Sequence, residues 1–179
     1  DEAMRIPIVG GNWKLNTTRD EAIALLVALR GELDGLAGVE VVVFPPAPWI
    51  GDAVDDLEGT TLQVGVQNVH WEPRGAFTGE QSAAILRGAA SHALIGHSER
   101  RHVFGESDED TNRKLRSVLE AGIVPVLAER SVVRWDPARA AKVHQRMERA
   151  AREACQQCRR LHLPRIERLI PLVDLVAAA

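Results

Sequence analysis

The chain has 179 residues, 45% of them apolar, which is enough to bury one sizeable core and favours one compact unit. Its 22 basic and 25 acidic side chains give a formal charge of −3 and are spread along most of the sequence, which argues against a surface for nucleic acid or another polyanion. Two cysteines, no N-terminal segment of the signal-peptide type and no run of 18 apolar residues indicate a soluble cytoplasmic protein with no membrane partner.

Short β-branched runs alternate with helical patterns over roughly the first 127 residues. The runs predict five strands, at residues 6–9, 39–44, 61–66, 93–95 and 123–127. The helical patterns predict four crossovers, at residues 19–33, 49–57, 80–90 and 108–121. Thr17 or Thr18 can cap the first helix, and Gly122 can end the last. Strands joined in this way predict a parallel sheet whose site lies in the loops after the strand carboxyl ends.

The composition changes after Glu129. Residues 134–165 contain nine Lys or Arg and three Asp or Glu, with no strand-like run. Apolar positions spaced by three, four and seven predict one long amphipathic helix that begins near Pro137 and is broken at Pro164. We therefore expect an α/β unit at residues 4–130 and a helical C-terminal extension at residues 131–179, which packs on the same unit or on a partner chain.

Three segments after predicted strands carry polar side chains suited to chemistry. Gly10-Gly11-Asn12-Trp13-Lys14 places an amide and a cation at a strand end, which suits an anionic substrate, although such a lysine is more often a solvated surface residue. In Gly96-His97-Ser98-Glu99-Arg100-Arg101, Ser98 can cap a short helix whose start disfavours a charged imidazole. A neutral His97 can donate to a polarised carbonyl, and the alternative is a loop histidine satisfied by the backbone. Residues 67–80 form a polar loop typical of a subunit contact or of a mobile surface segment.

Cys155 and Cys158 would share one helical face with His162 and could form a metal or redox pair. A tetrahedral zinc site needs a fourth ligand, a redox pair usually follows a strand, and Cys158 already fits the apolar stripe. No glycine-rich nucleotide loop, metalloprotease helix or nucleophile elbow is present. The sequence therefore predicts no metal site and no cofactor.

Taken together, three segments resemble the signature of the triosephosphate isomerases in order and spacing. They are Gly11-Asn12-Trp13-Lys14, Ala76-Phe77-Thr78-Gly79-Glu80, and Gly96 to Arg101 followed by Phe104-Gly105-Glu106-Ser107. The resemblance covers about residues 4–129. It implies a partial (β/α) TIM-type barrel with about five parallel strands, related to an eight-unit barrel that interconverts dihydroxyacetone phosphate and glyceraldehyde 3-phosphate, in glycolysis and gluconeogenesis, without a cofactor.

The resemblance also implies a role for each matching residue. Asn12 and Lys14 would hold the substrate, and Lys14 would supply positive charge to the enediolate. His97 would be the neutral electrophile that moves protons between the two substrate oxygens. Glu99 would orient Lys14 without contacting the substrate itself, and Ser98 would support the site in the same way.

The loop after the third predicted strand implies a homodimer or higher homo-oligomer. Thr78, with Phe77 and Gln67 in the same loop, would reach a neighbouring subunit's site, as the corresponding loop does in the family's dimer. The implied partners are a second copy of the chain and, weakly, a small phosphorylated sugar.

The family's pattern ends at Val126-Leu127. Here Ala128-Glu129-Arg130-Ser131 replaces the family's Cys-x-Gly-Glu-like turn, and nothing downstream resembles its Tyr-Glu-Pro-Val-Trp segment, which carries the catalytic glutamate. Glu148, Glu153 and Glu167 lie in Arg-rich helical patterns instead. A positioned general base contributes about 10²–10⁴-fold. We therefore expect an inactive or barely active homologue that acts as a self-associating scaffold. The alternative is a functional isomerase with a replacement carboxylate.

Five strands cannot close an eight-stranded barrel, so an open sheet would expose an edge and an apolar inner face. Our hypothesis is that the C-terminal helices from Pro137 onward, together with partner chains, cover this surface.

Overall fold

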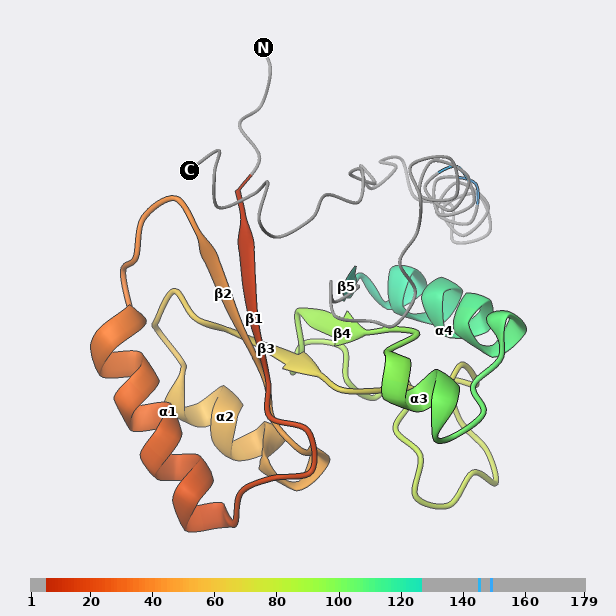
Figure 1. Cartoon of the computed structure of the whole chain (residues 1–179), viewed down its shortest axis with the longest axis horizontal. Coiled ribbons are helices and arrows are strands. Elements are labelled where there is room, and N and C mark those ends of the chain that lie inside the picture. The colour runs from red at the N-terminus through yellow and green to blue at the C-terminus, as the bar shows by residue number, and fades with distance from the viewer. Residues whose placement is uncertain (1–5, 127–144, 146–148, 150–179) are drawn as a thin grey trace.

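The computed structural model describes residues 6–126 together with Gln145 and Arg149. Its elements, in chain order, are β1 (Ile8–Asn12), α1 (Arg19–Leu33), β2 (Glu40–Phe44), the 3-10 helix η1 (Ala47–Trp49), α2 (Ile50–Asp56), β3 (Gln63–Val66), β4 (His92–Leu94), α3 (Ser98–His102), α4 (Asp108–Ala121) and β5 (Val124–Val126). The strands form one parallel sheet in the order β1-β2-β3-β4-β5. Figure 1 shows α1 and α2 beside β1 to β3, with α3 and α4 on the side of β4 and β5. This half-barrel confirms the predicted fold class.

Local sequence signals set the ends of the two long helices. The Thr18 side chain accepts from the backbone N–H of Glu21 at the start of α1, and the Glu21 side chain accepts from the backbone of Thr18 in return. Ser107 and Asp110 form the same capping box at the start of α4. Gly122 follows α4 with φ 75°, a left-handed conformation that glycine adopts without steric cost. Of the two threonines considered for the first cap, Thr18 is the one used.

The helix predicted at residues 80–90 was wrong. This stretch makes only isolated turns, in which Leu86 N–H donates to Ser82 O (3.2 Å) and Ala90 N–H donates to Leu86 O (3.0 Å). Gly79 and Gly88 hold φ values of 90° and 86°, which a right-handed helix does not allow. A bridge between His70 and Ser82 also ties the stretch to the preceding loop. The positive φ values of these glycines and the contact with the preceding loop therefore prevent the helix that the alanine-rich composition favours.

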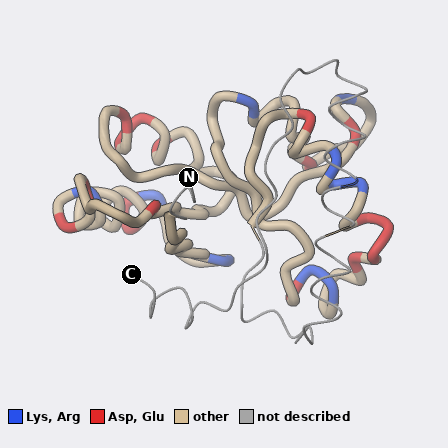
Figure 2. Tube along the Cα trace, turned by 90° about the horizontal axis from the view of Figure 1, so that it is seen from above, with Lys and Arg blue, Asp and Glu red and all other residues tan. Residues whose placement is uncertain are grey.

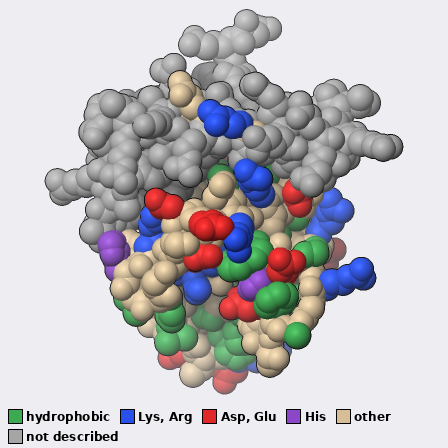
Figure 3. Space-filling view, turned by 90° about the vertical axis from the view of Figure 1, so that its right-hand side faces the viewer, with side chains coloured by type: hydrophobic (Ala, Val, Ile, Leu, Met, Phe, Trp, Pro, Cys, Tyr) green, Lys and Arg blue, Asp and Glu red, His purple; other side chains and the backbone are tan. Residues whose placement is uncertain are grey.

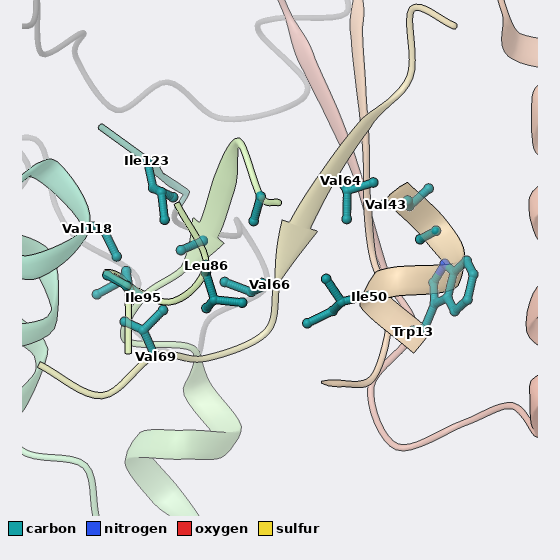
Figure 4. Close-up of a cluster of buried hydrophobic side chains, with 14 of the residues drawn as sticks. Trp13, Val43, Ile50, Val64, Val66, Val69, Leu86, Ile95, Val118 and Ile123 are labelled. Carbon is teal, nitrogen blue, oxygen red and sulfur yellow. The ribbon is translucent and has the colours of Figure 1, made fainter. Parts of the chain in front are cut away.

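The outward face of the sheet packs against the helices in one large core. Figure 4 shows Val43, Val64 and Val66 of the sheet close to Ile50 of α2, with Val118 of α4 at the far side of the same cluster. Side chains alternate between the two faces of a strand, so the neighbours of these residues must point to the inner face of the sheet. The core therefore fixes which residues face the inside of the half-barrel.

The inner face carries a second, smaller cluster. Val42, Phe44 and Leu94 are buried there, with Ile8 and Val126 packed against them. Gly65 lies so close to the Phe44 ring that an added Cβ would be 2.3 Å from Cε1. The ring of Phe44 thus fills the space that the glycine of the neighbouring strand leaves open.

Charged residues lie mainly on the helices and loops around the sheet, whereas the strands at the centre are mostly uncharged (Figure 2). On the face that Figure 3 shows, acidic and basic side chains are interspersed with hydrophobic ones. No helix among residues 6–126 is long and apolar enough to cross a membrane. The predicted boundary at residues 130 and 131 and both cysteines lie outside the described residues. The helix predicted from Pro137 also lies outside them, except for Gln145 and Arg149, which are helical.

Candidate functional site

The predicted site residues of the first and fourth strand ends come together. Asn12 is the last residue of β1, and His97 follows β4 by three positions. Although 85 positions separate them in the sequence, Asn12 Nδ2 lies 3.4 Å from His97 Nε2. The carboxyl ends of parallel strands meet at one edge of the sheet, which is why residues so distant in sequence become neighbours.

Lys14 is held at both its backbone and its side chain. Its φ is 57°, a left-handed conformation that costs a residue other than glycine about 1–2 kcal/mol. Its N–H donates to Asn12 Oδ1 (2.9 Å), and its carbonyl accepts from Gln67 Nε2 (2.9 Å). Its Nζ donates to Glu99 Oε1 (2.5 Å). These contacts stabilise a strained backbone that directs the ammonium group toward α3.

Glu99 is the anionic partner of this lysine. The hydrogen bond from Lys14 lowers the pKa of the Glu99 carboxyl below its usual value, and the charge of Lys14 acts in the same direction, against the opposing effect of desolvation. Both side chains of the pair are about half exposed, so the pair orients the ammonium group more than it stabilises the fold.

The contacts of His97 define which ring nitrogen carries its proton. The backbone N–H of Glu99 approaches His97 Nδ1 at 3.3 Å, and a backbone N–H can only donate. The Glu99 carboxylate lies farther from Nδ1, at 3.7 Å, and Lys14 already engages it. His97 Nδ1 is therefore the acceptor, and the proton of the neutral ring is on Nε2.

This tautomer gives the site its chemical character. With the proton on Nε2, the 3.4 Å contact between Asn12 Nδ2 and His97 Nε2 joins two donors and is not a hydrogen bond. Both groups are free to donate to one oxygen atom placed between them. Together with the ammonium group of Lys14, they suit an oxygen that gains negative charge during a reaction.

One detail of the predicted cap was wrong. We expected Ser98 to cap the short helix, but the N-cap of α3 is His97, whose ring accepts from Glu99 N–H, and Ser98 is the first helical residue. An imidazole nitrogen takes the place of the usual serine or threonine oxygen. Ser98 is nevertheless buried, directly beside the histidine in the chain.

The three loop residues predicted to reach a neighbouring subunit separate into two groups. Thr78 and Phe77 are exposed, and the Phe77 ring packs on His70 with centroids 4.3 Å apart. Gln67 instead faces the site, because its Nε2 donates to both Lys14 O and Phe44 O, each at 2.9 Å.

The support that Gln67 gives to the Lys14 backbone was missed from the sequence. Its one signal was its position, directly after the third predicted strand. No group of three or more His, Cys, Asp or Glu side chains suited to a metal ion occurs among the residues described.

The chain is thus a parallel TIM-type half-barrel whose strand ends bring together an amide, an ammonium group and an imidazole. The family model described as triosephosphate isomerase matches residues 7–160. Its match continues past Glu129, into the segment that we assigned to the helical extension.

Individual relatives match the first part of the chain. The triosephosphate isomerases of Dehalococcoides mccartyi and Endomicrobium trichonymphae are each 41% identical to it, over 124 and 125 residues, which is 69% of this chain and 49% and 50% of those proteins. The crystal structure of triosephosphate isomerase from Bartonella henselae at 1.6 Å resolution superimposes with a TM-score of 0.63 and 38% identity, over 69% of this chain and 51% of that one. The chain therefore belongs to the triosephosphate isomerase family, and it spans about half the length of the curated relatives that it matches.

Proposed function

We propose that residues 6–126 form the substrate-binding and electrophilic half of a triosephosphate isomerase site, and that the 179-residue polypeptide alone turns over dihydroxyacetone phosphate at most weakly. The observation that carries the proposal is the convergence of Asn12 Nδ2 and His97 Nε2, 3.4 Å apart, beside a lysine held by Glu99. An aldose–ketose isomerisation passes through an enediolate, and this group of donors is complementary to its oxygens.

The proposed roles follow from the contacts. Asn12 uses its oxygen to hold the Lys14 backbone, so only its Nδ2 remains to bind substrate. Lys14 supplies the positive charge. His97 donates from Nε2 to the carbonyl oxygen and accepts the proton of the neighbouring hydroxyl in turn. No metal or other cofactor takes part in this proposal.

The weak turnover follows from the missing base. Residues 130–179 contain no segment like the family's Tyr-Glu-Pro-Val-Trp. A general base contributes about 10²–10⁴-fold, or about 3–5.5 kcal/mol of transition-state stabilisation. Self-association does not restore the base, because every copy lacks the same group. We therefore propose a self-associating scaffold that retains half of an active site.

A coupled isomerase assay tests the proposal. The polypeptide is compared with the Dehalococcoides mccartyi relative over a range of enzyme concentrations, and with its own His97→Ala and His102→Ala variants. We expect turnover at least about 10²-fold below that of the relative. The exposed His102 lies on the same short helix and serves as the matched control. Residual turnover that disappears in His97→Ala but not in His102→Ala supports the electrophilic role.

The alternative function is an active isomerase whose base is a carboxylate elsewhere in the chain. Turnover within about tenfold of the relative, abolished by His97→Ala, would establish it. Replacing Glu148, Glu153 and Glu167 one at a time with glutamine would then identify the base. A third function, as a redox or metal protein, requires bound metal or a cycling disulfide at Cys155 and Cys158 in the purified protein.

The open sheet supports self-association. Within the described part of the chain, β1 and β5 each pair with one strand only, and Val9 and Val124 on these edge strands are about half exposed. We propose that a further copy, together with the helical extension at residues 131–179, covers this surface. Light scattering at micromolar concentration that detects only compact monomers would contradict the intermolecular part. The cytoplasm is the proposed compartment, on the basis of the two-cysteine composition.

A further inference from the structure

A buried ion pair lies behind the candidate site and takes no part in the chemistry proposed above. The Nζ of Lys114, on α4, donates to Glu106 Oε2. Lys114 is 5% exposed and Glu106 is 8% exposed. Burying two charges is costly unless each has further partners, so the other contacts of the pair indicate what it does.

The partners of this pair lie on the elements that carry the site. Glu106 Oε2 accepts from Arg100 Nε on α3 (3.0 Å), and the backbone N–H of Glu106 donates to Arg100 O (3.0 Å). Lys114 Nζ also donates to Asn68 Oδ1 (2.8 Å), one residue after the Gln67 that holds Lys14. The pair therefore joins α4 both to α3 and to the end of β3.

Burial alone would raise the pKa of the Glu106 carboxyl, but the hydrogen bonds and charges of Lys114 and Arg100 outweigh burial and lower it. Glu106 is thus a carboxylate at neutral pH and holds both cations. Without Lys114, a buried carboxylate would keep one cation only, and the geometry of its bond to Arg100 would no longer be fixed.

The helix that needs this support is α3. It has five residues, far fewer than the ~12–15 below which an isolated helix is marginal in water. Yet α3 must hold the backbone N–H of Glu99 toward His97 Nδ1, because the competing partner of Nδ1 is the Glu99 carboxylate, 3.7 Å away. A small displacement of α3 would favour the other tautomer, in which Nδ1–H donates to that carboxylate. Figure 1 shows α3 beside α4, the helix that carries Lys114.

We propose that Lys114 is a positioning residue that, through Glu106 and Arg100, holds α3 in the place that keeps the His97 proton on Nε2. Arg101 gives α3 a second anchor, from its NH1 to Thr111 Oγ1 (3.0 Å). That hydroxyl lies 3.3 Å from Glu106 Oε1, so both anchors of α3 meet at the same carboxylate. The inference deepens the proposed function, since it concerns the electrophile of the same site.

The test is the tautomer of His97, read from the ring nitrogens by proton–nitrogen NMR correlation, with a His97→Gln spectrum for assignment. In Lys114→Met the ratio of the Nε2–H to the Nδ1–H form should fall by about fivefold, the effect of losing one ordinary hydrogen bond. The matched control is Arg113→Met, which removes the neighbouring positive charge of α4 from an exposed pair with Glu109 and should leave the ratio unchanged.

A folded Lys114→Met protein with the tautomer ratio of the unmodified chain overturns the proposal. If Lys114→Met does not fold, Arg100→Met is measured instead, because it cuts the link to α3 and leaves the buried pair in place. An unchanged ratio there overturns the proposal equally. The tautomer measurement needs no turnover. The positioning role of Lys114 can therefore be refuted while the isomerase assay supports the proposed function, and the proposed function can be refuted while the positioning role stands.

Discussion

The ring of Phe44 in β2 lies directly against Gly65 of β3, and this contact sets a sharp prediction for Gly65→Ala. The new Cβ would lie 2.3 Å from Phe44 Cε1 and 2.5 Å from Cδ1. The optimum for two carbon atoms is about 3.5–4.0 Å, so the ring or the strand must move by more than about 1 Å. The ring has little room to move away, because Gly10 of β1 lies on its other side. The backbone there is so close that a Cβ added at Gly10 would be 3.0 Å from Phe44 Cε2.

Overpacking of this kind costs about 1–3 kcal/mol, and the double constraint on the ring places Gly65→Ala at the upper end, about 3 kcal/mol. Urea unfolding followed by circular dichroism measures the cost. The control is Gly31→Ala in α1, where an added Cβ meets nothing within 4 Å and should stabilise by about 0.5–1 kcal/mol.

A second substitution identifies the cause. Phe44→Leu shortens the ring side chain, so Gly65→Ala should cost less in that background by at least about 1 kcal/mol. If Gly65→Ala is as stable as the unmodified chain, or if its cost is the same with leucine at position 44, then Phe44 does not lie against β3 and this packing of the inner face is refuted.

Burial lowers the pKa of His92 below its usual value near 6.5, and the charge of Glu40 opposes this effect. Near and below pH 6.5 the unfolded chain therefore binds more protons at this position than the folded chain does. The free energy of unfolding should decrease as the pH falls through this range. Between about pH 7.5 and about pH 5, the urea midpoint should decrease less in His92→Gln than in the unmodified chain, whereas the exposed-site control His102→Gln should behave like the unmodified chain. The same pH dependence of the midpoint in all three proteins would contradict this. Ser107→Ala removes the α4 cap and should cost about 1 kcal/mol, whereas Ser117→Ala inside the helix should cost almost nothing. Lys14→Gly relieves a φ of 57° and should be about 1 kcal/mol more stable than Lys14→Ala, which loses the same charge; the opposite order in thermal unfolding would exclude backbone strain.

Local signals predicted the parts of the fold that local physics controls. The boundaries of α1 and α4 follow from capping residues and from Gly122, and the structure reproduces residues 19–33 and 108–121 as predicted. Strand ends were harder to predict, because the end of a strand depends on hydrogen bonding to the neighbouring strand and not on local sequence. β1 continues to Asn12, three residues past the apolar run, since Gly11 and Asn12 still pair with Val43 and Phe44.

The failures came from glycine geometry and from long-range contacts. The stretch at residues 80–90 has helical composition, but positive φ at Gly88 and the bridge from His70 to Ser82 override it. The same limit applies to the site. Its charged and polar residues could be named from their motifs, but the grip of Gln67 on the Lys14 carbonyl links positions 53 apart and has no local pattern.

Contacts among residues 6–126 hold both Lys14 and His97 in place. Lys14 has its backbone N–H bound by Asn12, its carbonyl by Gln67 and its ammonium group by Glu99, all within residues 6–126. The ring of His97 is likewise fixed by the backbone of its own helix. Hydrogen-bond donors stabilise a developing charge best when they do not have to reorganise during the reaction. The contacts that hold Asn12, Lys14 and His97 in place are made within residues 6–126. If turnover is low, as we propose, the His97 tautomer separates two causes: the proposed lack of a base, which leaves the tautomer unchanged, and a displaced imidazole, which changes it.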